Sequence, residues 1–543
     1  MTPPPARTSN ALAWTLAMLL LVAARVPAIA QPAGNDQHLY LYTGQRVFEG
    51  QVPYVDAWDQ KPPGIFFLYG ALWQIWPRES VVAIADLGAA AITAWLLVTL
   101  GRRTGDVTAG RLAAVVYLAG SHPSLSRLSG VYVRGQSEVF IAMFVTAALV
   151  QCAAPLRTRA RLIAAGACLG AAFVIKYNAA AYGMAIVAAL LAWRGRSAGA
   201  GGTADGRPPM PMSQQLGWVA AGGAAICLSV LAYFAAHGAL EALRLATIDY
   251  NVRYSRETYA GGALGAVKYF VTLPIGRMRV DPLWYLGGIG ALAMLLCRAP
   301  RDRVLVGVAW LASTVASIMI NGARDLPQYF VQAGPALAMA AAWGFAALPQ
   351  SARVRAVVAT AVIAVGAWKV GLEAPSFAGV RLFGAPQLAA NIRDDVASLS
   401  GRIDRHTYLT RFTGGQKYDA AAVDDLARQV RETTRPDDRI FVFGFAPGVY
   451  VNGNRRSASR FFWSRPVILE FAADHPGYGT PGLLADLRAA TPAIVALQKQ
   501  DWFPDVANSC DFFLASDPLR SWLDEGYVLD RETPVFLVYR RRS

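Results

Sequence analysis

The sequence predicts an α-helical polytopic membrane protein of about eleven transmembrane helices, followed by a small C-terminal extracytoplasmic α/β domain. Three observations lead to this fold class. Only 16% of the 543 residues are charged, whereas soluble domains carry roughly a quarter, and the mean hydropathy is +0.32. The missing charge leaves long apolar runs near the length that a bilayer requires. Short arginine clusters then occupy every second connection between these runs.

The first apolar run, 11–30, is interpreted as an uncleaved first helix. Its end, Val26–Ala30, has the small residues of a signal-peptide cleavage site, but about 20 residues are enough to span. Two later runs are short for a span, namely 108–121 and 161–175. In order, the other expected spans are 80–101, 137–155, 178–193, 216–236, 282–297, 303–320, 328–348 and 353–371.

The arginine clusters set the expected orientation, because loops rich in Arg and Lys stay on the cytoplasmic side. The N-terminus is therefore expected inside, and the C-terminal tail outside. The net charge of +15 comes largely from these loops, and no nucleic-acid motif accompanies it, so nucleic-acid binding is excluded. The connections expected outside are 31–79, 122–136, 176–178, 237–281 and 321–327.

The change in composition near residue 383 divides the chain into a multi-span region, 1–382, and an extracytoplasmic domain, 383–543. Cys510 is the lone cysteine of the second region, so no disulfide is expected there. Periodicity predicts an amphipathic helix over 420–433, buried strands over 439–444 and 493–497, and a closing hairpin of 527–530 with 534–539.

The first outer loop, 31–79, concentrates the residues that could carry chemistry. Asp36 directly follows the first span, and 39–49 has the periodicity of an interfacial helix. A carboxylate at the bilayer surface can act as a general base that deprotonates an acceptor hydroxyl. The alternative is an ordinary helix-capping or solvated aspartate. Tyr54 and Asp59 add an aromatic ring and a second carboxylate to the candidate substrate site.

Lys61 lies on the outer side, against the positive-inside bias, and Pro62-Pro63 restrict its backbone. A fixed cation at headgroup depth suits a lipid phosphate and would stabilise that phosphate as a leaving group. The alternative is an interfacial lysine whose ammonium only reaches toward water.

Further candidates stand at the outer ends of later spans. Glu138 opens the fourth span and is either a functional acid or a first-turn glutamate favoured by the helix dipole. Arg134 could pair with it one turn away or hold phosphate. Lys176 and Arg324 could bind phosphate or only headgroups, and Tyr329 could bind substrate or belong to the aromatic belt.

The histidines show no metal-ligand spacing, and the chain has no glycine-rich phosphate loop or Gly-x-Ser-x-Gly elbow. We therefore expect neither a metal nor a cofactor. A nucleotide donor is also not expected for a site on the outer face.

The first outer loop resembles that of GT-C glycosyltransferases. It is most similar to the bacterial branch near the protein O-mannosyltransferases and the lipid A aminoarabinose transferases, over about residues 10–370. The resemblance rests on Asp36, Tyr42, Glu49-Gly50, Pro53-Tyr54, Asp56 and Asp59-Gln60-Lys61-Pro62-Pro63. Less specific similarity is found at Gln328-Tyr329-Phe330 with Pro335, and in the tail at 443–460.

The resemblance implies an inverting transferase that moves a sugar from a polyprenyl-phosphate donor to a hydroxyl acceptor. The acceptor would be a glycan, lipid or protein at the outer face of the bacterial cytoplasmic membrane. Asp36 matches the catalytic aspartate, Lys61 the lysine that binds the donor phosphate, and Glu138 the second acidic position.

Two positions depart from the family pattern. Gln37 stands where relatives often carry Glu, and Gln328 where they often carry His. The first departure leaves Asp36 as the base of that pair and weakens the case for a metal. A transporter or flippase of polyprenyl-linked sugars is the second hypothesis, but it would need polar or broken helices near the midplane. A non-catalytic scaffold would not need Asp36, Lys61 and Glu138 together.

Overall fold

The computed structural model divides the chain into two compact units. Unit 1 comprises Met1–Ile29, Ile84–Leu231 and Tyr254–Arg393, and unit 2 comprises Ala30–Ala83, Ala232–Arg253 and Asp394–Ser543. The first outer loop thus belongs to the same unit as the C-terminal residues. The expected boundary at 382/383 lies outside the described residues. The structure describes residues 6–125, 130–193, 210–256, 262–297, 299–322, 326–349, 351–371, 385–413, 418–502 and 506–542.

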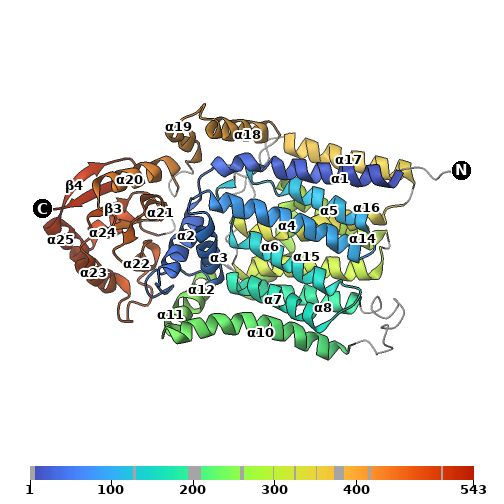
Figure 1. Ribbon diagram of the computed structural model, residues 1–543, viewed down its shortest axis with the longest axis horizontal. Coiled ribbons are helices and arrows are strands. Elements are labelled where there is room, and N and C mark those ends of the chain that lie inside the picture. Colours follow the sequence, from blue (N-terminus) through green and yellow to red (C-terminus); the bar gives the residue numbers. More distant parts are fainter. Residues whose placement is uncertain are drawn as a thin grey trace. The chain divides into compact units, whose positions relative to one another are not determined.

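Unit 1 is helical, and Figure 1 shows its helices side by side with roughly aligned axes. Close contacts join α5 to α16, α6 to α7, α8 to α15 and α14 to α16. The helices that lie in it for all or most of their length are α1 (Ala6–Ala23), α4 (Val81–Arg103), α5 (Val107–Gly120), α6 (Ser137–Cys152), α7 (Arg159–Ile175), α8 (Gly183–Ala192), α10 (Met212–Ala236), α13 (Gly262–Val280), α14 (Pro282–Leu296), α15 (Arg301–Ile320), α16 (Gly334–Ala347) and α17 (Ala352–Gly371).

The polytopic helical class is confirmed, while the count of eleven spans stays a prediction. Among the described residues, five segments are long and apolar enough to cross a membrane: Ala11–Ala30, Val81–Arg103, Met212–Ala236, Arg301–Ile320 and Pro327–Ala347. Shorter apolar helices accompany them at Gly64–Ile75, Val107–Gly120, Ser137–Cys152, Tyr177–Ala192 and Pro282–Leu296.

Small residues allow α14 and α16 to pack closely. A Cβ atom added to Gly290 would lie 2.4 Å from the carbonyl oxygen of Ala340, and one added to Gly344 would lie 2.3 Å from that of Gly290. Real side chains cannot occupy this space, so the two backbones touch directly, as in other membrane helix pairs.

Several helices lie where only loops were expected, among them α3 and α13. α3 (Gly64–Ile75) is a 12-residue apolar helix in the first outer loop, too short to be counted as a span. α13 contains Lys268, Pro274, Arg277 and Arg279, which interrupt its apolar pattern. It packs against α14 and α15. Hydropathy therefore misses α3 because it is short, and it misses α13 because charged residues and a proline interrupt it.

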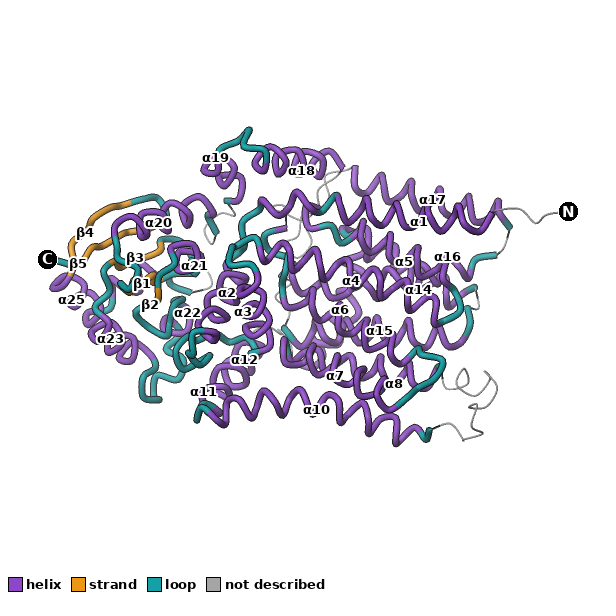
Figure 2. Tube along the Cα trace, viewed as in Figure 1, coloured by secondary structure: helices purple, strands orange, loops and turns teal. Residues whose placement is uncertain are grey.

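Unit 2 contains α2 (Asn35–Phe48), α3 and a five-stranded sheet (Figure 2). The strands are β1 (Arg439–Phe443), β2 (Arg456–Ser457), β3 (Ile494–Gln498), β4 (Tyr527–Glu532) and β5 (Phe536–Arg541), in the order β2-β1-β3-β5-β4. β1 pairs parallel with β2 and β3, and β5 pairs antiparallel with β3 and β4. The strands and the hairpin predicted from the sequence are therefore present.

Helices flank the sheet and bury its central strands. Every residue of β3 is buried, as expected for a strand covered on both faces. The predicted helix over 420–433 is present as α20 (Ala420–Thr433). The other helices of this part are α19 (Arg405–Leu409), α21 (Gly448–Gly453), α22 (Arg465–Ile468), α23 (Gly479–Ala490), α24 (Ser509–Ala515) and α25 (Asp517–Gly526).

Candidate active site

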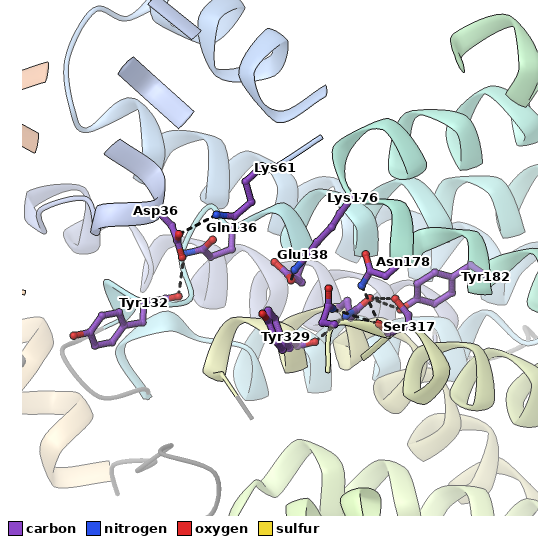
Figure 3. Close-up of polar contacts among 12 residues, drawn as sticks. Asp36, Lys61, Tyr132, Gln136, Glu138, Lys176, Asn178, Tyr182, Ser317 and Tyr329 are labelled. Carbon is purple, nitrogen blue, oxygen red and sulfur yellow. Dashed lines mark hydrogen bonds and ion pairs between the residues drawn. The ribbon is translucent and has the colours of Figure 1, made fainter. Parts of the chain in front are cut away.

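The predicted site residues form two clusters, one in each unit. In unit 2, Asp36 and Lys61 form an ion pair with 3.1 Å between Lys61 Nζ and Asp36 Oδ1 (Figure 3). Asp36 lies in the first turn of α2, where the helix dipole favours a carboxylate. The exposed fractions of the two side chains are 22% for Asp36 and 15% for Lys61, so both reach the surface of the unit.

The surroundings of Lys61 keep it charged. Burial on its own lowers the pKa of Lys61, but the charges of Asp36 and Asp59 and the phenol oxygen of Tyr40 outweigh burial and raise that pKa well above its ordinary value. The ammonium also lies 5.4 Å from the centre of the Tyr40 ring. Lys61 is therefore a fixed cation, and sequence analysis did not identify Tyr40 as its neighbour.

Asp59 and Tyr54 support the backbone around Lys61. Asp59 is fully buried, and its Oδ1 accepts hydrogen bonds from the backbone N–H of Gln60 at 2.6 Å and of Lys61 at 3.3 Å. Burial raises the pKa of Asp59, against the charge of Lys61. Tyr54 is also fully buried, and its hydroxyl donates to the Lys61 carbonyl at 2.7 Å. The substrate contacts expected of both residues stay a prediction.

Tyr54 adopts φ = +70°, a conformation that costs a bulky residue about 1–3 kcal/mol. Its buried ring packs 5.5 Å from the Phe234 ring and 6.1 Å from the Phe66 ring. These contacts and the hydroxyl bond hold the strained conformation beside Lys61.

The start of α2 is anchored by Glu79. Glu79 Oε1 accepts from the Ala33 N–H at 2.8 Å and lies 2.9 Å from His38 Nε2, and its Oε2 lies 3.4 Å from Arg405. The Ala33 carbonyl accepts from the Tyr418 hydroxyl at 2.8 Å. Both backbone polar groups of Ala33 are thus satisfied, which fixes the chain three residues before Asp36.

Glu79 is expected to make the protein less stable in acid. Burial raises its pKa, but the hydrogen bond and charge of His38, together with Arg405 and the Ala33 N–H, lower the pKa to about 2 from the ordinary 4.5. Because the folded pKa is the lower one, Glu79 stabilises the fold above pH 4.5 and loses this contribution as the pH falls toward 2.

Glu79→Gln should therefore lower the midpoint of thermal unfolding at pH 7 and flatten the loss of stability between about pH 4.5 and 2. Glu49→Gln, on the exposed end of α2, is the matched control. Parallel curves for wild type and Glu79→Gln across this pH range would contradict the assignment.

In unit 1, Glu138 pairs with Lys176 at 2.5 Å, and the Lys176 ammonium lies 4.3 Å from the centre of the Tyr329 ring (Figure 3). Glu138 lies in the first turn of α6, and its side chain is only 1% exposed. Three residues predicted separately are thus brought together, from three different elements. An acid, a cation and an aromatic ring share one buried location.

Lys176 and Tyr329 are held by two 3₁₀ segments, η4 (Tyr177–Tyr182) before α8 and η6 (Pro327–Ala333) before α16. Gln332 joins these segments: its Oε1 accepts from the hydroxyls of Tyr182 at 3.1 Å and Ser317 at 2.7 Å. Its Nε2 donates to the Tyr329 carbonyl at 2.9 Å. Sequence analysis missed this network, although a buried glutamine in an apolar run is an available signal.

Arg134 is buried and donates to the Ala28 carbonyl at 2.7 Å. Next to it, the Gly135 N–H donates to Asp86, which lies 3.8 Å from Arg25. Arg134 therefore helps to fix the loop before α6, while Glu138 forms its ion pair with Lys176. Arg324, the remaining predicted cation, lies outside the described residues.

A pocket lies within unit 1. Its charged groups include two Arg–Asp pairs, Arg25 with Asp86 at 3.8 Å and Arg277 with Asp281 at 3.2 Å. Most of the remaining lining is apolar, and it includes Val139, the residue after Glu138. The described residues contain no group of three or more His, Cys, Asp or Glu side chains that could hold a metal ion.

Neither a protein-family model nor a curated protein sequence matches the chain. Solved structures do. ArnT from Cupriavidus metallidurans, bound to undecaprenyl phosphate, is similar with a TM-score of 0.64 at 16% identity, over 98% of both chains. Its apo structure gives 0.60 at 14% identity, again over 98% of both chains. AglB, an archaeal oligosaccharyltransferase from Archaeoglobus fulgidus, overlaps more loosely, with a TM-score of 0.42 at 12% identity over 97% of this chain and 74% of the other.

The likeness to ArnT, a lipid A aminoarabinose transferase, confirms the fold that the sequence resemblance implies. At 16% identity the likeness shows the fold. The chemistry of the chain depends on the residues of the two clusters.

Proposed function

We propose that this chain is a membrane glycosyltransferase that moves a sugar from a polyprenyl-phosphate donor to a hydroxyl acceptor. The observation that carries the proposal is the Asp36–Lys61 pair, a carboxylate and an ammonium 3.1 Å apart that both remain partly exposed. The fold supports it, since ArnT has the same architecture and was solved with undecaprenyl phosphate bound. The proposed location is the outer face of the bacterial cytoplasmic membrane, with the N-terminus inside and unit 2 outside.

In the proposed reaction, Asp36 accepts the proton of the acceptor hydroxyl. The acceptor oxygen forms a bond to the anomeric carbon of the sugar, while the bond from that carbon to the donor phosphate oxygen breaks. The phosphate leaves with the bonding electron pair, and the Lys61 ammonium stabilises the developing negative charge. Attack opposite the leaving group inverts the anomeric configuration.

The pairing of Lys61 with Asp36 links donor binding to base activation. A donor phosphate attracts the same ammonium that neutralises Asp36 in the absence of donor. Once Lys61 binds the phosphate, the Asp36 carboxylate is released to accept a proton. Lys61 stays cationic in this exchange because it has an anionic partner at each stage, first Asp36 and then the donor phosphate.

The proposal is tested by incubating the purified protein in liposomes with synthetic polyprenyl-phosphate sugars and a panel of glycan, lipid and peptide acceptors. Formation of a glycosylated acceptor with inverted configuration is the expected result. Movement of the lipid-linked sugar across the bilayer without transfer would favour the alternative, a transporter or flippase. Glycolipids and envelope glycans of a deletion strain would identify the acceptor class.

We further propose that Glu138 and Lys176 act as an interdependent pair, with Lys176 binding an anionic substrate group and Glu138 orienting the Lys176 ammonium. Glu138→Gln and Lys176→Met should each lower kcat/KM about 10–100-fold, because each leaves the other side chain buried without its partner. The double variant should lose much less than the product of the two effects.

Lys268→Met is the matched control, since Lys268 is an exposed lysine on α13 of the same unit. Multiplicative losses in the double variant would argue that Glu138 and Lys176 act independently. Wild-type rates in both single variants would remove the pair from the reaction.

A further inference from the structure

The carboxyl ends of the parallel strands β1, β2 and β3 form the edge at which open α/β sheets normally bind ligands. In unit 2, the last residue of β2 and residues that follow this strand contact the first outer loop. The Ser457 N–H donates to the Tyr42 hydroxyl of α2 at 2.7 Å. The Tyr42 ring also packs 4.5 Å from the Phe462 ring. Contacts between α2 and α21 continue this junction (Figure 1).

Trp58 lies in the interior of this junction. It is fully buried, and its ring lies 5.1 Å from the Tyr250 ring and 5.8 Å from the Trp463 ring. Its N–H donates to the Arg460 carbonyl at 2.9 Å, and its carbonyl accepts from Trp463 Nε1 at 2.9 Å. The side chain and both backbone polar groups of Trp58 are therefore engaged, immediately before Asp59-Gln60-Lys61.

The carbonyl groups of this short segment accept hydrogen bonds from three different parts of unit 2. Trp463 donates to the Trp58 carbonyl, and Asn251 donates to the Gln60 carbonyl at 2.7 Å. The Tyr54 hydroxyl donates to the Lys61 carbonyl at 2.7 Å. Asn251 follows a π-helical turn, Leu245–Asp249, a feature frequent at functional sites. Pro62-Pro63 then end the segment.

We infer that the C-terminal sheet domain is the template that positions the reacting loop, with Trp463 as a positioning residue that acts on Lys61 through the Trp58 carbonyl. The inference rests on the proposed function, because it assigns the domain a task in the same reaction. We call the hydrogen bonds from Trp463 to the Trp58 carbonyl and from Asn251 to the Gln60 carbonyl the clamp. Displacement of a reacting group by about 1 Å can cost about 10²-fold in rate, so loss of the clamp should have a measurable effect.

The test compares Trp463→Phe with Trp502→Phe in the full-length protein. Both variants retain an aromatic ring and lose one indole N–H. Trp502 is the matched control because it is similarly buried in the same domain, but its N–H donates to Ser464, not to the first outer loop. Hydrogen-exchange mass spectrometry follows the peptide spanning 52–63, and transfer assays follow kcat and donor KM.

Trp463→Phe is expected to speed exchange in 52–63 and to lower kcat/KM about 10–100-fold, whereas Trp502→Phe does neither. Asn251→Ala removes the hydrogen bond to the Gln60 carbonyl and should behave like Trp463→Phe. Combining Trp463→Phe with Lys61→Ala should add little to the effect of Lys61→Ala, because the positioning acts through Lys61.

Unchanged exchange in 52–63 for both Trp463→Phe and Asn251→Ala would overturn the clamp, whatever the activity. Faster exchange with unchanged transfer would overturn its role in the reaction, as would multiplicative losses with Lys61→Ala. If the wild-type protein has no transferase activity, the proposed function is refuted, and so is the role of the sheet domain in catalysis. The hydrogen-exchange data would still show whether Trp463 and Asn251 hold residues 52–63 in place.

Discussion

Replacing Asp36 with Asn is expected to reduce sugar transfer about 10²–10⁴-fold, the range that general-base catalysis contributes. Asn keeps the shape of the side chain and an oxygen that can still accept a hydrogen bond from the Lys61 ammonium. It cannot accept the acceptor's proton at neutral pH. The first turn of α2 should therefore keep its geometry while the reaction loses its base.

Initial rates with a polyprenyl-phosphate sugar measure the effect, and competition with the sugar-free polyprenyl phosphate measures donor binding. Donor binding should be retained, because Lys61 keeps its position and its positive charge in this variant. Asp56→Asn is the control in the same loop: Asp56 is exposed, and its Oδ2 accepts from the Val52 N–H at 2.7 Å. Undiminished transfer by Asp36→Asn would sink the assignment of the base.

Two sequence signals predicted the fold, namely hydropathy and the placement of arginines. Each signal is read over a segment about as long as one membrane span. They locate most helices because a span needs a long uncharged run. They fail at α13, where Arg277 is accommodated inside the protein: its guanidinium packs 4.1 Å from the centre of the Phe330 ring and pairs with Asp281 at 3.2 Å. Such compensation depends on neighbours that are remote in sequence.

Distance along the sequence also decides what could be predicted of the candidate site. Asp36 and Lys61 stand out because the loop between them carries a dense motif, and their ion pair closes over only 25 residues. Glu138 and Lys176 were each identifiable as charged groups at span ends, but their pairing depends on how α6 and α7 pack. Gln332 was missed because one amide scarcely changes the hydropathy of a span.

The division into units also has a physical origin that composition does not reveal. The first outer loop is enclosed by two spans in sequence, yet Trp58 and Tyr42 are buried against residues after 394. Tyr42 lies in the stretch 39–49, which sequence analysis interpreted as an interfacial helix. Burial against a folded domain and burial in a lipid interface select the same residue types.

Replacing Lys61 with Ala is expected to raise the donor KM and to lower kcat/KM about 10²–10³-fold. Truncating one partner of a close, partly buried charge pair costs about 2–5 kcal/mol, and here the lost ammonium has two proposed tasks, to bind the donor phosphate and to stabilise it as it leaves. The loss should appear in both KM and kcat, because the second task concerns only the transition state.

Lys61→Met separates charge from packing, since Met retains most of the aliphatic stem against Tyr40. If the ammonium is what matters, Met should be about as inactive as Ala, while Lys61→Arg should recover part of the donor affinity because guanidinium also binds phosphate. Lys499→Ala, which removes a lysine paired with the exposed Glu532, is the control for general effects on unit 2. Recovery of activity by Met would show that Lys61 acts through packing, and an effect confined to acceptor KM would refute its contact with the donor phosphate.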